Sequence, residues 1–179
     1  MPRRSVPLTR LAARPSPRLA LVLGATLWAI ATTGSAMASI PPPLATVAEQ
    51  SGFERTGRYD EVTALAAAFQ ARYPDRVAAR SFGTTPEGRP MQVLVVTATG
   101  AFDPAEARRR GLPVVLVQGG IHAGEIDGKD AGFLALRQVL EGQAASGALD
   151  KVVWLFVPVF NVDGHERFGA WNRPNQRGP

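Results

Sequence analysis

Residues 113–125 read PVVLVQGGIHAGE, and this stretch decides the fold. Residues 113–118 form a continuous apolar run, which is typical of a strand that is covered on both faces of an α/β sheet. The two glycines that follow allow the chain to turn sharply and let a ligand approach the backbone. His122 and Glu125 then lie at the carboxyl end of the strand, which is where ligands bind in such sheets.

Periodic segments lie on both sides of this strand. Helices are predicted over residues 60–72, from Asp103 to Gly111, and from the glycine turn to about Leu140. Further strands are predicted over residues 91–98 and 152–160, the second losing its pairing before Pro158 because proline cannot donate to a ladder. The buried stripe of the third helix is expected to be Phe133, Leu136, Val139 and Leu140. This alternation predicts a partial mixed α/β sheet with helices on both faces.

The charge of the chain is concentrated at its beginning. There are 20 Lys and Arg against 15 Asp and Glu, but five of the arginines and none of the acids lie in the first 38 residues. From Ser39 onward the count is therefore 15 against 15, which argues against nucleic-acid binding because that binding depends on neutralising phosphates. The absence of Cys excludes disulfides, thiolate nucleophiles and Cys-ligated metals.

Residues 1–38 have the pattern of a secretory signal peptide. Arginines come first, an uncharged and mostly apolar run covers residues 19–31, and Ala36-Met37-Ala38 offers a small-residue cleavage site. The run is shorter than the roughly 20 residues of a membrane span, although an uncleaved anchor stays open as an alternative. We therefore expect a secreted or periplasmic protein with no membrane contact beyond the signal peptide. After the signal peptide, residues 39–57 are expected to form a Pro-rich linker.

His122 and Glu125 are candidate metal ligands. Their spacing of three places both side chains on one side of a turn or a first helical turn. An imidazole nitrogen and a carboxylate oxygen are both accepted by zinc. The alternative is structural: His122 is a capping or loop residue, and Glu125 complements a helix N-terminus.

Four motifs in order resemble the zinc carboxypeptidase family, of the carboxypeptidase A class. The opening helix ends at Pro74, the turn GTTPEGRP covers residues 83–90, IHAGE covers residues 121–125, and NVDG at residues 161–164 precedes Asn172-Arg173. The resemblance covers residues 58–179, which would then be part of a catalytic domain. It implies a Zn²⁺ site with two His and one Glu, two of these ligands being His122 and Glu125, and a peptide substrate.

The resemblance also implies residues that are absent from this chain. In the family the second zinc histidine, the Asn-Arg pair that binds the substrate carboxylate, the capping Tyr and the catalytic Glu lie further downstream. We therefore expect an N-terminal fragment that is inactive alone, with no catalytic residue of its own. Arg173 and Arg177 are candidate substrate-binding residues, although Gln176 occupies the position expected for the oxyanion arginine. Gly124 replaces the arginine that carboxypeptidase A members carry there.

The polar residues around the NVDG motif receive structural interpretations. His165 could replace the missing zinc ligand, but the sequence favours a surface loop residue. Asp163 and Asn161 are expected to order their loop by accepting hydrogen bonds from backbone amides. Two other functions stay open for the whole chain: a zinc amidohydrolase of the succinylglutamate desuccinylase or aspartoacylase type, and a degenerate module without catalysis.

Overall fold

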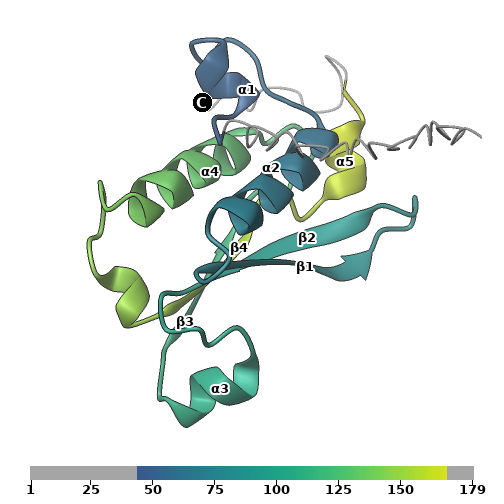
Figure 1. Cartoon of the computed structure of the whole chain (residues 1–179). Helices are drawn as coiled ribbons and strands as arrows, with labels where there is room; N and C mark the ends of the chain where they lie inside the picture. Colours follow the sequence, from purple (N-terminus) through teal and green to yellow (C-terminus); the bar gives the residue numbers. More distant parts are fainter. Residues whose placement is uncertain (1–43, 169–179) are drawn as a thin grey trace, which may run out of the picture. The chain divides into compact units, whose positions relative to one another are not determined.

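A mixed sheet of four strands in the order β1-β2-β4-β3 is the centre of the structure. The computed structural model describes residues 44–168 (Figure 1), so the predicted signal peptide lies outside the described residues. The strands are β1 (Val77–Thr84), β2 (Pro90–Val96), β3 (Val114–Gln118) and β4 (Val153–Val157). The helices are α1 (Val47–Gln50), α2 (Tyr59–Arg72), α3 (Pro104–Arg109), α4 (Asp127–Leu140) and α5 (Val162–Glu166), with the 3-10 turn η1 (Ala148–Asp150). None of the helices in residues 44–168 has the length and hydropathy needed to cross a membrane.

Strand direction changes twice across the sheet. β1 and β2 form an antiparallel hairpin, and β2 is also antiparallel to β4, whereas β3 and β4 run parallel. The parallel pair is joined through α4, as a crossover connection requires. The predicted mixed α/β sheet is confirmed, and β1 is a strand that the sequence did not indicate.

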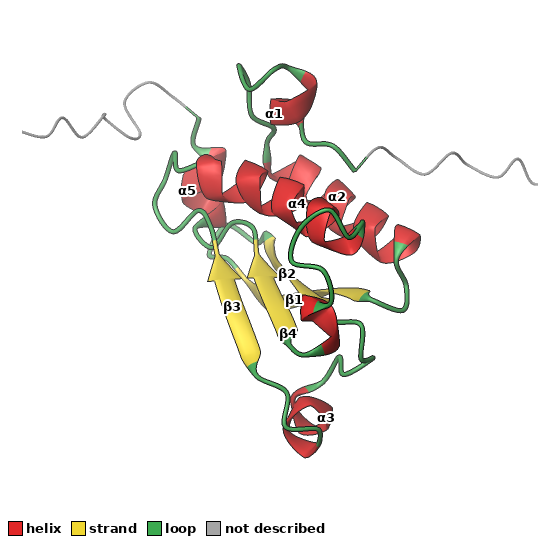
Figure 2. Cartoon of the chain, turned by 90° about the vertical axis from the view of Figure 1, so that its left-hand side faces the viewer, coloured by secondary structure: helices red, strands yellow, loops and turns green. Residues whose placement is uncertain are grey.

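The main core lies between one face of the sheet and the helices α2 and α4 (Figure 2). Phe69 of α2, Phe133 of α4 and Phe156 of β4 are all fully buried. The ring of Phe133 stacks on Phe69 at 5.8 Å and meets Phe156 edge-on at 5.2 Å between centroids. These aromatic contacts join α2 to α4 and α4 to β4.

A smaller cluster covers the opposite face. Leu94 and Val96 of β2 belong to the main core, whereas Val95 between them packs with Val153 of β4 and with Ala107 of α3. Alternate residues of a strand point to opposite faces, so α3 packs against part of the second face. The Asp103 side chain caps α3 by accepting from the Glu106 amide, as the sequence predicted. Helices on both faces are therefore confirmed.

β3 differs from its prediction. The sequence indicated a strand covered on both faces, but Val114, Val115, Leu116 and Val117 are 52%, 46%, 58% and 39% exposed. Within residues 44–168 this strand pairs with β4 alone, so no described strand adjoins its other edge. An apolar strand with an open edge is a template for pairing with another chain.

Residues 44–57 also differ from the predicted linker, because they contain α1 and pack onto the helices. Thr46 is fully buried and forms a capping box with Glu49. Glu49 in turn makes an ion pair with Arg137 of α4. These polar contacts hold residues 44–57 against the helices, although the sequence pattern predicted a linker there.

We predict that residues 39–179, expressed alone, self-associate through the open edge of β3. Replacing Leu116, which is 58% exposed, with Lys should raise the concentration at which this segment stays monomeric, because a charged side chain on an edge strand opposes pairing with another chain. Light scattering and size-exclusion chromatography measure this. Phe82→Lys on β1, where the ladder register is already broken near Ser81, is the control and should change little. A monomeric wild-type segment with a sharp cooperative melt would refute the prediction.

Candidate metal centre

His122 and Glu125 lie side by side in the turn between β3 and α4. The Nδ1 atom of His122 is 2.8 Å from Oε1 of Glu125, and the His122 amide donates to Oε2 at 3.3 Å. Their side chains are 62% and 37% exposed, so both donors are open to solvent. The predicted spacing has therefore brought an imidazole and a carboxylate together on one accessible side of a turn.

Close backbone contacts hold this turn in place. A Cβ atom on Gly119 would lie 2.6 Å from the Pro158 carbonyl oxygen and 3.0 Å from the Gly128 carbonyl carbon, so only glycine fits there. The Gly119 carbonyl accepts from the Phe160 amide at 3.0 Å, and the Gly120 carbonyl accepts from the Asn161 amide at 2.8 Å. The turn after β3 is thus joined directly to the turn after β4.

Asp163 connects the NVDG segment to the turn at residues 85–89. Its Oδ1 atom accepts from the Thr85 hydroxyl at 2.8 Å and from the Arg89 guanidinium at 2.6 Å, while Oδ2 accepts from the Glu87 amide at 3.1 Å. Desolvation acts to raise the pKa of Asp163, but the hydrogen bonds from Thr85 and Arg89 outweigh it and lower that pKa. The prediction that Asp163 binds a backbone amide is confirmed, although the amide belongs to a different loop.

Asn161 begins α5. Its side-chain oxygen accepts from the Gly164 amide at 3.0 Å, which is the expected local hydrogen bond at a helix start. A depression of about 490 Å³ lies between Asn161, Glu87, Arg167 and Ala123, the last of which directly follows His122. Space for a polar ligand is therefore available beside the two candidate metal ligands.

His165 has a different environment from the one predicted. It is 3% exposed instead of lying in a surface loop, because its ring packs edge-on against Phe168 at 5.6 Å and bonds the Gly57 backbone. Burial and the nearby charge of Lys129 lower the pKa of His165, so the neutral ring is favoured. Its Nε2 atom is buried without a hydrogen-bond partner.

The described residues supply two metal donors of the right kind. Imidazole nitrogen and carboxylate oxygen both suit zinc, and their proximity and exposure allow them to bind one ion. Between residues 44 and 168 no group of three or more His, Cys, Asp or Glu could hold a metal, so His165 does not complete the set. Arg173 and Arg177, predicted to bind substrate, lie outside the described residues.

Sequence reasoning missed a buried charge next to this turn. Lys129 is fully buried and lies between the carboxylates of Glu61 and Asp130. A signal was present, because Lys129 precedes Phe133 by four residues and Leu136 by seven, which places it on the apolar stripe of α4. A charge on such a stripe indicates a buried ion pair.

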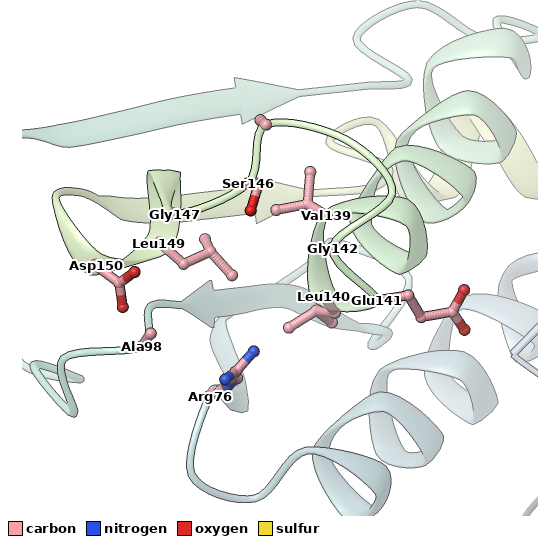
Figure 3. A pocket seen from close by; sticks show the side chains of 11 residues that line it. Arg76, Ala98, Val139, Leu140, Glu141, Gly142, Ser146, Gly147, Leu149 and Asp150 are labelled. Carbon is pink, nitrogen blue, oxygen red and sulfur yellow. The ribbon is translucent and has the colours of Figure 1, made fainter.

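A separate pocket of about 370 Å³ lies near the other end of α4 (Figure 3). Leu140 and Leu149 line it together with Arg76, and the loop at residues 141–147 forms its edge. Because α4 has 14 residues, about 21 Å of helix lies between this pocket and the turn that carries Glu125. The pocket is therefore distinct from the candidate metal centre.

Comparisons with known proteins converge on one family. Residues 62–178 match the family model described as zinc carboxypeptidase. The chain is 28% identical over 114 residues to carboxypeptidase B of Helicoverpa zea, covering 60% of this chain and 25% of that protein. It is 38% identical over 88 residues to the inactive metallocarboxypeptidase ecm14 of Schizosaccharomyces pombe, covering 47% of this chain and 18% of that protein. It therefore spans a quarter or less of these relatives.

The fold comparison agrees with the sequence comparison. The crystal structure of carboxypeptidase A from Helicoverpa armigera matches with a TM-score of 0.53 and 24% identity. The match covers 61% of this chain and 25% of that chain. This similarity confirms that the described sheet and helices have the arrangement seen in part of a carboxypeptidase fold.

The buried state of His165 predicts an acid-sensitive fold. A lowered pKa means that the folded protein binds fewer protons than the unfolded chain below the ordinary His value of about 6.5. This contribution to stability is therefore present above pH ~6.5 and is lost as the pH falls through the folded pKa, with a slope of at most about 1.4 kcal/mol per pH unit. Urea unfolding between pH 8 and 5 measures it. His165→Phe should flatten the profile, and an unchanged slope in that variant would assign the effect elsewhere.

Proposed function

Because this chain belongs to the zinc carboxypeptidase family, we propose that it is the N-terminal part of an exported zinc metallocarboxypeptidase that hydrolyses peptide bonds. His122 and Glu125 are two of its three protein zinc ligands. The observation that carries this proposal is the 2.8 Å approach of His122 Nδ1 to Glu125 Oε1 on a solvent-accessible turn. The second zinc histidine and the catalytic glutamate would come from residues downstream of this chain, as the family resemblance implies.

In that scheme the residues of this chain bind the zinc ion and orient its carboxylate ligand. When bound, zinc supplies a Lewis acid that polarises a carbonyl and acidifies water. His122 must be neutral at one ring nitrogen to bind the metal, and Glu125 must be ionised. The hydrogen bond from the His122 amide to Glu125 Oε2 holds the carboxylate beside the ring before any metal arrives.

The space for substrate is more open than in carboxypeptidase A members. Gly124 stands where those members carry an arginine, so no side chain projects from that position between the two ligands. The depression beside Ala123 leads toward Arg167, and we assign it to the peptide chain of the substrate. Arg173 and Arg177 are proposed to bind the substrate as well, with Arg177 the weaker assignment because Gln176 occupies the expected position.

A second candidate is a degenerate module that keeps the fold without catalysis. The relative from Schizosaccharomyces pombe named an inactive metallocarboxypeptidase is 38% identical over the aligned part, which favours this reading. Retention of both His122 and Glu125 in contact favours the enzyme. The match to the zinc carboxypeptidase model favours either of them over a desuccinylase-type amidohydrolase.

Substitution of a zinc ligand tests the enzyme directly. In the full-length protein, His122→Ala should weaken zinc binding by at least a factor of about 100 and abolish peptidase activity, because a direct ligand contributes more than its supporting residues do. Zinc competition titration and hydrolysis of peptides with free carboxyl ends measure these effects. His165→Phe is the matched control and should keep both. Zinc retention and activity in His122→Ala would remove His122 from the site.

The zinc content of residues 39–179 tests the ligand count. We expect less than one tightly bound zinc per chain after dialysis against metal-free buffer, because the described residues contain no group of three donors. Mass spectrometry of the dialysed segment measures this. Stoichiometric zinc would show that this segment supplies a third ligand, and the proposal that the ligand comes from downstream would be wrong.

A further inference from the structure

A buried cluster of charges includes the first turn of α4, the helix that follows the proposed zinc ligands. Lys129 is fully buried, and its Nζ atom lies 2.6 Å from Oε2 of Glu61 and 2.7 Å from Oδ1 of Asp130. Both carboxylates are also largely buried, with side chains 12% and 10% exposed. Charges removed from water in this way are costly unless they are paired and hydrogen-bonded.

The remaining oxygens of the cluster have partners in residues 44–58. The second oxygen of Asp130 accepts from the Thr56 hydroxyl at 2.7 Å. The second oxygen of Glu61 accepts from the Val47 amide. Every carboxylate oxygen of the cluster is thus hydrogen-bonded or ion-paired, so the cluster connects α2, α4 and the segment that precedes α2 in one defined arrangement.

The position of Lys129 links the cluster to the metal centre. Lys129 lies four residues after Glu125, in the first turn of α4, and its amide donates to the Ile126 carbonyl at 3.1 Å. No side chain caps this helix at Ile126. The start of α4 is instead fixed by the charge cluster and by the contact of Gly128 with Gly119. A shift or rotation of that first turn would move Glu125 away from His122.

We propose that Lys129, together with Glu61 and Asp130, acts as a positioning device for Glu125 in the zinc site. This inference rests on the proposed function. Replacement of a buried ion pair by apolar residues is often neutral or stabilising, so stability alone does not account for a lysine at this place. The directional ion pair between Lys129 of α4 and Glu61 of α2 fixes how α4 sits on α2, which an apolar side chain would not do. Misplacement of a functional group by about 1 Å can cost about a hundredfold in rate.

The other end of α4 provides a matched control. Arg137 lies in the last turn and makes an ion pair with Glu49 of α1, so it also joins α4 to residues 44–58. Eight positions along the helix separate it from Lys129, which is about 12 Å. Loss of the Arg137 pair removes another ion pair that anchors the helix but does not touch its first turn.

The experiment compares Lys129→Met with Arg137→Met in the full-length protein. Lys129→Met should weaken zinc binding by roughly tenfold, the lower end of the effect of residues that support metal ligands. It should also change the visible spectrum of the Co²⁺-substituted protein, because the geometry of the carboxylate ligand changes. Arg137→Met should leave zinc affinity within about twofold and the Co²⁺ spectrum unchanged, whatever its effect on the melting temperature.

Each result decides the proposal. Zinc affinity and Co²⁺ spectrum that are unchanged in Lys129→Met would overturn it, as would equal losses in both variants, because these would reflect general stability. If Lys129→Met does not fold, Thr56→Val removes only the hydroxyl bond to Asp130 and should still shift the Co²⁺ spectrum; an unchanged spectrum there overturns the proposal. A wild-type protein that binds no zinc would instead refute the proposed function itself.

Discussion

The contact between the backbones at Gly119, Gly128 and Pro158 is the constraint on which the rest of the structure depends. At this point the end of β3, the start of α4 and the turn after β4 touch without intervening side chains. The contact places the turn with His122 and Glu125 next to the segment with Asn161 and Asp163. Two glycines thereby set the layout of the whole candidate site.

Segments with strong local signals were predictable from the sequence. The helix ending before Pro74, the cap at Asp103 and the pairing of β4 that stops before Pro158 all follow from single residues with well-defined backbone effects. β1 was not predictable, because its sequence VAARSFGT has little apolar alternation. It is a strand because β2 pairs with it along most of its length, which is a tertiary effect.

The candidate site also has features that were predictable from the sequence and features that were not. The spacing of His122 and Glu125 and their place after an apolar strand were enough to bring both donors together, since these depend on short-range geometry. The burial of His165 was not evident, because it depends on Gly57 and Phe168 from either side in the sequence. The exposure of β3 was missed because a continuous apolar run indicates burial whether or not the covering elements lie in the described part.

The packing of residues 44–58 bears on where the domain begins. Motif resemblance begins at residue 58 and the family model at residue 62. The folded unit nevertheless includes Thr46, which is fully buried. It also includes three residues before residue 58 that bond to the helices: Glu49 pairs with Arg137, Val47 with Glu61, and Thr56 with Asp130. A recombinant boundary chosen from the motifs would therefore remove the ion-pair partner of Arg137 and one hydrogen-bond partner each of Glu61 and Asp130. The shortest version of this domain that can be expected to fold begins at or before Leu44.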